Sequence, residues 1–264
     1  SSNEKENMMK KTFARLPSRN EVGVWQVRTL TDQERYSEAA GLINTLRNDP
    51  LFPKRLYPYF EELQGYWFFK QQMYDSAIVH IKNAIPNAID VADKARREYL
   101  LAQLYELNDH QDTASYYYDK VIKLTTDPLM DIYANLNKAK MLKSKDPAEI
   151  DKSIDKLVHM ARKDKFESYR DIIYSSAGEL ALEKPDTSEA VSLYKKSTFY
   201  NQENVSLKNN AFLTLAEISY HQKKYRDAYN FYDSLQTGDT ALTNLADILS
   251  RKSALEKIVT NLNI

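Results

Sequence analysis

Histidine, cysteine, serine and acidic side chains would carry metal binding or covalent catalysis, and this sequence arranges few of them usefully. The chain has no cysteine, so it has no thiolate ligand, thiol nucleophile or disulfide. Its four histidines, His80, His110, His159 and His221, form no His-Glu-x-x-His pair. The glycines are too widely spaced for a phosphate-binding loop, and no serine lies in a nucleophile elbow. The sequence therefore predicts a protein that is not an enzyme and binds no metal or cofactor.

Adjacent carboxylates could act as general acid and base, and Glu61-Glu62 is such a pair. We expect this pair at the exposed start of a helix, where negative side chains complement the helix dipole. It therefore predicts a structural role and not a catalytic one.

The overall charge argues against nucleic acid as a partner. Lysine and arginine number 37, and so do aspartate and glutamate, which leaves a net charge of zero. Nucleic-acid binders usually carry a basic excess that neutralises phosphates. Only residues 138–165 are locally basic. That segment is either a solvated helix face or a surface for an acidic protein or phospholipid headgroups.

The cellular compartment stays open on composition alone. A chain without cysteine is compatible with the cytosol and with an oxidising periplasm. No run approaches the roughly 18 apolar residues of a transmembrane helix, and the sequence as given predicts no signal peptide ahead of the fold. The chain begins Ser1-Ser2-Asn3, so we expect an excised fragment or a processed product. Residues 1–19 are polar, and we expect them to be disordered or to continue an upstream repeat.

The elements that position these side chains are predicted to be helices that repeat along the chain. The five glycines and eight prolines are too few for an all-β protein, and helix-forming residues dominate. A small residue recurs twelve positions before an alanine, as in Gly65 with Ala77 and Ala216 with Ala228. The second anchor falls at positions 39, 77, 114, 153, 190 and 228, in steps of 38, 37, 39, 37 and 38. Such a period predicts six helix pairs whose backbones approach at the small residues.

This spacing resembles the tetratricopeptide repeat (TPR) family. The resemblance implies an all-α, right-handed superhelical TPR-like solenoid of about six helix pairs plus a C-terminal capping helix. The repeats are expected at residues 20–57, 58–94, 95–131, 132–170, 171–208 and 209–239, with the cap at 240–264. Tyr105, Tyr118, Tyr194 and Tyr232 stand at an aromatic anchor position and should be buried.

The sequence also departs from the family pattern. The step is longer than the family's 34 residues, Val27 replaces a small residue, and an insertion at 145–149 predicts a protruding turn. The Lys and Asn residues with which some members grip a C-terminal carboxylate are absent, which disfavours a receptor for chaperone tails.

In this family, positions on the first helix of each repeat line a concave protein-binding groove. Transferred to this sequence, they give a set of tyrosines and charged residues, the mixture typical of protein interfaces. The alternative is that longer helices close the groove and these rings pack internally. The candidate binding residues are Tyr59, Glu62, Tyr66, Phe69, Lys70, Arg96, Tyr99, Gln103, Glu106, Tyr133, Lys140, Lys143, Glu217 and Tyr220.

Three segments, residues 165–174, 228–234 and 259–263, resemble a narrower group. These are the SprE/PorW-type TPR lipoproteins of the type IX secretion and gliding machinery of Bacteroidota. The resemblance implies a periplasmic protein that an N-terminal lipid, absent from this chain, tethers to the outer membrane. Its partners would be the secretion translocon and the periplasmic ring and motor components.

The sequence thus predicts a non-catalytic protein-binding scaffold, by resemblance in a cell-envelope secretion assembly. A generic cytosolic TPR co-chaperone or regulatory adaptor is one alternative. A solenoid that binds glycans or lipids is another.

Overall fold

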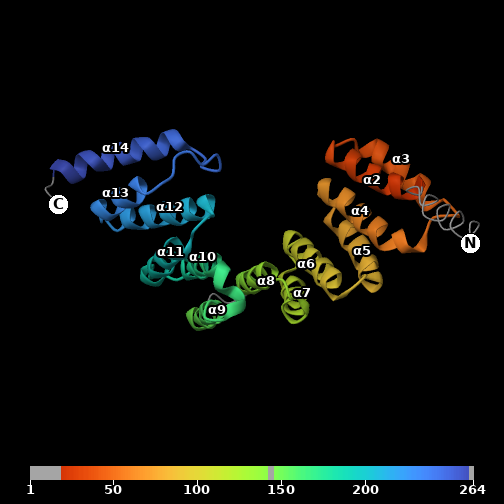
Figure 1. Cartoon of the computed structure of the whole chain (residues 1–264), viewed down its shortest axis with the longest axis horizontal. Coiled ribbons are helices and arrows are strands. Elements are labelled where there is room, and N and C mark those ends of the chain that lie inside the picture. The colour runs from red at the N-terminus through yellow and green to blue at the C-terminus, as the bar shows by residue number, and fades with distance from the viewer. Residues whose placement is uncertain (1–18, 142–145, 262–264) are drawn as a thin grey trace, which may run out of the picture. The chain divides into compact units, whose positions relative to one another are not determined.

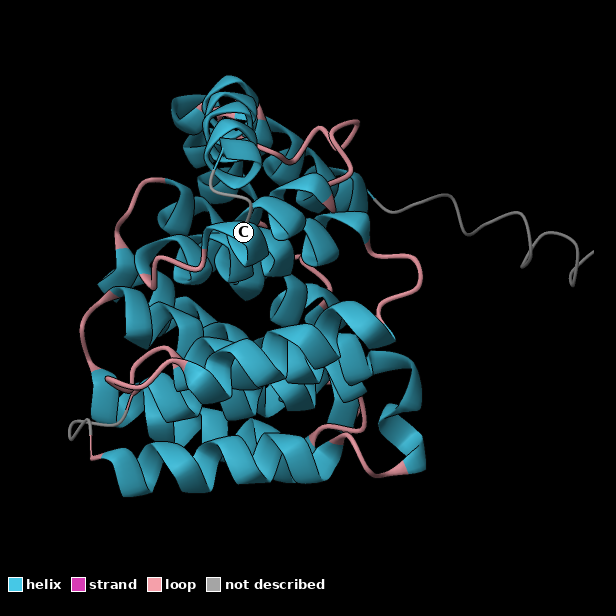
Figure 2. Ribbon diagram, turned by 90° about the vertical axis from the view of Figure 1, so that its left-hand side faces the viewer, coloured by secondary structure: helices cyan, strands magenta, loops and turns pink. Residues whose placement is uncertain are grey.

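The computed structural model describes residues 19–141 and 146–261, and within these ranges every regular element is a helix (Figures 1 and 2). The chain divides into two compact units, Ser1–Thr125 and Thr126–Ile264. The predicted all-α, TPR-like helical-repeat fold is therefore confirmed. Residues 1–18 and the start of the turn expected to protrude lie outside the described residues.

Within residues 19–125, the first unit contains three helix pairs, each of which packs against the next. Short 3-10 helices, η1 (Lys54–Leu56) and η2 (Ile85–Asn87), flank the middle pair. The helices of the first unit are α2 (Arg19–Asp32) with α3 (Tyr36–Arg47), α4 (Tyr57–Lys70) with α5 (Tyr74–Ala84), and α6 (Val91–Leu107) with α7 (Gln111–Leu124).

The second unit contains three further pairs and a final helix that covers α13. A 3-10 helix, η3 (Asp164–Tyr169), precedes its middle pair. The helices of the second unit are α8 (Pro128–Lys140) with α9 (Pro147–Met160), α10 (Arg170–Ala181) with α11 (Ser188–Tyr200), α12 (Val205–His221) with α13 (Tyr225–Asp233), and α14 (Leu245–Asn261).

The small residues of the repeat lie where paired helices cross. Ala77, Ala190 and Ala228 have no exposed surface. A Cβ atom on Gly65 would stand 2.9 Å from Cδ1 of Ile81, and one on Gly178 would stand 3.0 Å from the ring of Tyr194. These distances are shorter than ordinary van der Waals contacts, so a larger residue at either position would have to displace Ile81 or Tyr194.

Three first helices begin four residues earlier than the repeat boundaries we expected, at Val91, Pro128 and Val205. Each is preceded by a side chain that accepts hydrogen bonds from the free amides of the first turn: Asp90 from Asp93, Asp127 from Leu129, and Asn204 from Leu207. The capping residue therefore sets where each of these helices begins, ahead of the first residue of the repeating apolar pattern.

Three of the four tyrosines at the aromatic anchor position are buried, as predicted: Tyr118, Tyr194 and Tyr232. Burial raises the pKa of Tyr194 to about 12. The fourth, Tyr105, is only half-buried. It stacks on Tyr117 with 5.4 Å between ring centroids, because both rings lie at the edge of the α6–α7 pair.

Candidate protein-binding groove

The first helices of the first unit enclose two adjoining pockets. One, of about 370 Å³, lies between α2 and α4 and has an apolar wall that includes Trp25 and Tyr59. The other, of about 400 Å³, is lined mainly by α4 and α6 and includes Phe69 and Leu107. Arg28, Glu62 and Leu63 line both pockets. We call this continuous depression the N-terminal groove.

Six of the predicted binding residues meet in this groove, although they come from two different repeats. They are Tyr59, Glu62, Tyr66, Phe69, Arg96 and Gln103. Several large apolar side chains beside them stay exposed, among them Trp25 (67 %) and Leu107 (50 %). Exposed apolar surface in a concave site is typical of a place where another molecule binds.

Trp25 and Arg28 were not among the predicted residues. The groove positions of the first repeat are hard to locate in the sequence, because Val27 replaces the small residue that would fix the register of that repeat.

A network of charged side chains borders the groove through two of its members, Glu62 and Arg96, and we call this network the floor. Arg96 donates two parallel hydrogen bonds to Glu62, at 2.7 and 2.6 Å, and Nε of Arg97 lies 3.3 Å from the same carboxylate. Asp93 lies 3.1 Å from each of the two arginines. Arg97 is completely buried and also donates to the carbonyl of Ala84 at 2.9 Å. Two carboxylates therefore neutralise two guanidinium groups, and the floor holds α4 and α6 together.

The ionisation of Glu62 reflects these contacts. Burial acts to raise the pKa of Glu62, but the hydrogen bonds and charges of Arg96 and Arg97 outweigh it and hold the pKa below its ordinary value. The same pairing raises the pKa of Arg96.

The expectation that Glu61 and Glu62 occupy an exposed helix start is wrong. Both are half-buried, because α4 begins at Tyr57 and places them in its second turn. Glu61 lies 2.8 Å from Nδ1 of His80 on α5, and Glu62 pairs with α6. The sequence alone did not identify either partner, because both partners stand in later helices.

An aromatic wall closes one side of the groove. The hydroxyl of Tyr66 donates to Asp32 at 2.6 Å, which fixes the ring across α2. Phe69, 39 % exposed, lies roughly parallel to Tyr66 with 6.5 Å between centroids. The aliphatic side chains of Leu100 and Leu104 line the same pocket. The result is an apolar slot suited to a bulky side chain.

Two other predicted residues of the first unit, Tyr99 and Glu106, have internal partners. Tyr99 meets the ring of Tyr118 edge-on at 5.7 Å. Glu106 accepts a hydrogen bond from the Tyr118 hydroxyl. Lys70 is half-buried at the last turn of α4. For Tyr99 and Glu106, packing within the α6–α7 pair is what the structure shows.

The predicted residues of the second unit are more scattered. Tyr133 and Tyr220 are partly exposed, and Tyr220 meets Tyr225 edge-on. Glu217 lies 3.8 Å from Arg251 on α14. Lys140 pairs with Glu179 at 2.5 Å, and Lys143 lies outside the described residues.

The locally basic segment is partly neutralised. Besides Lys140, Lys165 lies 3.1 Å from Asp131. Both acidic partners stand outside residues 138–165, so the exposed basic excess of this surface is smaller than the sequence suggests.

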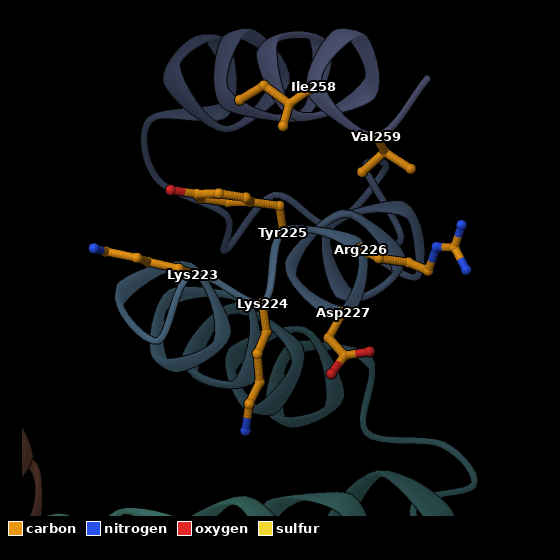
Figure 3. Close-up of a pocket in the computed structure, with 7 residues that line it drawn as sticks. All are labelled: Lys223, Lys224, Tyr225, Arg226, Asp227, Ile258 and Val259. Atoms are coloured by element: carbon orange, nitrogen blue, oxygen red, sulfur yellow. The ribbon is translucent and has the colours of Figure 1, made fainter. Parts of the chain in front are cut away.

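A small pocket of about 140 Å³ lies where α14 covers α13 (Figure 3). Ile258 and Val259 face the ring of Tyr225 across it, while the side chains of Lys224 and Arg226 point away. Its volume lies well below the roughly 300–1,000 Å³ typical of ligand pockets, so we assign it no ligand.

Two further findings bear on function. No three histidine, aspartate or glutamate side chains gather as a metal site within residues 19–141 and 146–261. Among the helices of these same ranges, none has the length and apolarity to span a membrane.

The fold has known counterparts. No protein-family model matches the sequence, and no curated protein does either. The apo form of RapI superposes with a TM-score of 0.68 at 14% identity over 86% of this chain and 68% of that one. The apo form of the quorum sensor NprR from B. thuringiensis gives 0.61 at 11% identity, over 97% of this chain and 75% of that one. NprR in complex with its cognate peptide NprX gives 0.52 at 11% identity, over 99% and 80%. At these identities the likeness shows a shared TPR-like helical-repeat fold.

Proposed function

We propose that this chain is a non-catalytic adaptor that holds an extended segment of a partner protein in the N-terminal groove. The observation that carries the proposal is the groove itself, in which two apolar pockets adjoin a charged floor whose side chains are held by one another. Exposed tryptophan, tyrosine and phenylalanine rings around a preorganised floor suit protein recognition. NprR, which shares the fold, has a cognate peptide, and this supports a peptide-like ligand.

We propose further that the adaptor works in a cell-envelope assembly, at the periplasmic side of the outer membrane, in type IX secretion and gliding. This finer proposal rests on the sequence resemblance of residues 165–174, 228–234 and 259–263 to the SprE/PorW-type lipoproteins. Its partners would then be the translocon and the ring and motor components.

Photocrosslinking in the native cell tests the adaptor role. A benzophenone amino acid replaces Tyr59 in the groove, and in a matched control it replaces Val79, which is exposed on α5. We expect a discrete crosslinked protein from position 59 and none from position 79. No product from position 59, or the same products from both positions, would contradict binding in the groove.

The identity and compartment of the crosslinked protein test the finer proposal. A periplasmic or outer-membrane partner supports the secretion assembly. A cytosolic partner favours the co-chaperone or regulatory alternative.

A further inference from the structure

On the wall shared by the two pockets of the N-terminal groove, more hydrogen-bond donors than acceptors are available to a bound segment. Glu62 offers its carboxylate to this wall, but both of its oxygens already accept from Arg96. The guanidinium of Arg96 in turn is held by Glu62 and Asp93. The acceptors of the floor are therefore occupied.

Arg28 supplies the open donors. Its side chain is 57 % exposed, and it forms a long i,i+4 ion pair with Asp32, whose carboxylate oxygen lies 3.9 Å from Nε, beyond hydrogen-bond distance. The other oxygen of Asp32 accepts the Tyr66 hydroxyl. Within the described part of the chain, Arg28 donates no hydrogen bond. A guanidinium carries five N–H groups and pairs best with a carboxylate.

The position of Arg28 determines what each side of a bound segment meets. It lines the pocket of Trp25 and Tyr59 and also the pocket of Phe69 and Leu107. An extended chain that fills both pockets with side chains passes the residues common to both linings, Arg28, Glu62 and Leu63.

On the basis of the proposed function, we infer that the partner segment carries an aspartate or glutamate between two bulky apolar side chains. The carboxylate binds Arg28, and the apolar side chains enter the two pockets. A basic residue at the centre would meet the open guanidinium of Arg28 and is disfavoured by like-charge repulsion.

Selection from a displayed library of random twelve-residue peptides on the immobilised full chain tests this inference. We expect the recovered peptides to place Asp or Glu between two residues of the Leu, Ile, Met, Phe and Trp class. Fluorescence anisotropy with the strongest peptide should show at least about tenfold weaker binding to Arg28→Glu, since a charge-assisted hydrogen bond to a carboxylate is lost and a repulsion is added. When the acidic residue of that peptide is replaced by lysine, the peptide should bind the wild type more weakly. The same lysine peptide should regain binding to Arg28→Glu.

Matched variants separate this inference from the proposed function. Arg226→Glu changes another exposed arginine, on α13, and should bind the peptide as the wild type does. Phe69→Ser should weaken every peptide that uses the groove, and circular dichroism confirms that each variant is folded. Arg28→Gln, which lacks the added repulsion, should bind the peptide more tightly than Arg28→Glu does.

Two outcomes would overturn the inference alone. Peptides that depend on Phe69 but show no acidic enrichment and bind Arg28→Glu normally would contradict it, and so would peptides with a basic centre, which would indicate recognition by Asp32. In either case the groove still binds protein segments. Failure to recover any Phe69-dependent peptide, together with no crosslink from position 59, would overturn the proposed function as well.

Discussion

Four turns between the helices of a pair hold a residue other than glycine in the left-handed backbone region. Glu34, Gln72, Asp109 and Lys223 have φ values between 57° and 61°. Each ends a first helix with the same pair of hydrogen bonds. At Gln72 these run from its own N–H to the Phe69 carbonyl and from the Met73 N–H to the Phe68 carbonyl, at 2.9 and 3.0 Å. This Schellman arrangement favours glycine, so each turn stores backbone strain.

Replacing one of these residues should reveal that strain. Gln72→Gly should raise the unfolding free energy by about 0.5–1 kcal/mol, because relief of the strain exceeds the added entropy of the unfolded chain. Gln72→Val should lower it by more than about 1 kcal/mol, because a β-branched side chain disfavours positive φ. Urea unfolding followed by circular dichroism measures both changes.

The neighbouring Gln71 provides the control, because its φ is −97°. Gln71→Gly should destabilise the protein. If glycine at 71 and at 72 had the same effect, the turn at Gln72 would not be strained.

At the scale of the elements, the charged floor of the groove links α4 to α6, two helices of successive repeats. Glu62 is the acidic residue that bridges them, and its carboxylate is about a quarter exposed. The completely buried Arg97 depends on Glu62 and Asp93 for its charge partners. Loss of the charge on Glu62 therefore weakens the contact between the two repeats.

The pKa of Glu62 gives this contact a pH dependence. Because its pKa in the folded state lies below its ordinary value of 4.5, the stabilisation is complete above that value and is lost as the pH falls through the lower, folded-state pKa. Glu62→Gln should lower the melting temperature at pH 7, and the difference from the wild type should shrink as the pH falls below about 4.5. Thermal melts between pH 7 and pH 3 measure this.

Glu38→Gln is the matched control. Glu38 also pairs with an arginine, Arg35, but both side chains are exposed. Removal of this pair should leave the melting curve almost unchanged at every pH. An equal effect of the two variants would show that burial of the Glu62 network contributes nothing.

At the scale of the whole molecule, helices contact mainly their neighbours along the chain within each unit. In such repeat proteins stability is a sum over local interfaces, so a defect spreads only to adjacent elements. The last interface of the second unit is formed by α14, whose Leu255 and Ile248 pack with Tyr232 and Ala228 of α13.

Leu255→Ala should therefore destabilise one end of the chain. Loss of this buried side chain costs about 2–5 kcal/mol of local stability. Hydrogen exchange should accelerate across α12, α13 and α14 and remain unchanged in α4 and α5. Leu249→Ala, at a half-exposed position of α14, should change neither region. A uniform acceleration through both units would show instead that the chain unfolds as a single cooperative body.

The sequence by itself determined the helical class, the pairing of helices and their interval. These follow from local properties, because small residues allow two helix backbones to approach closely, and Ala77, Gly65, Ala228 and Gly178 mark such crossings directly. It also indicated part of the groove, since Tyr59, Tyr66 and Phe69 occupy the outward positions of one first helix.

Only the tertiary structure decided which of these residues form a site. Tyr99 occupies the same kind of position as Tyr66, yet it packs on Tyr118, while Tyr66 bonds to Asp32 of the preceding repeat. Glu62 meets Arg96 and Arg97 from 34 and 35 residues away, and Arg28 keeps only a long ion pair with Asp32. Such choices depend on which side chains the stacked repeats bring within a few ångströms of one another, and the spacing of residues along one helix does not contain that information.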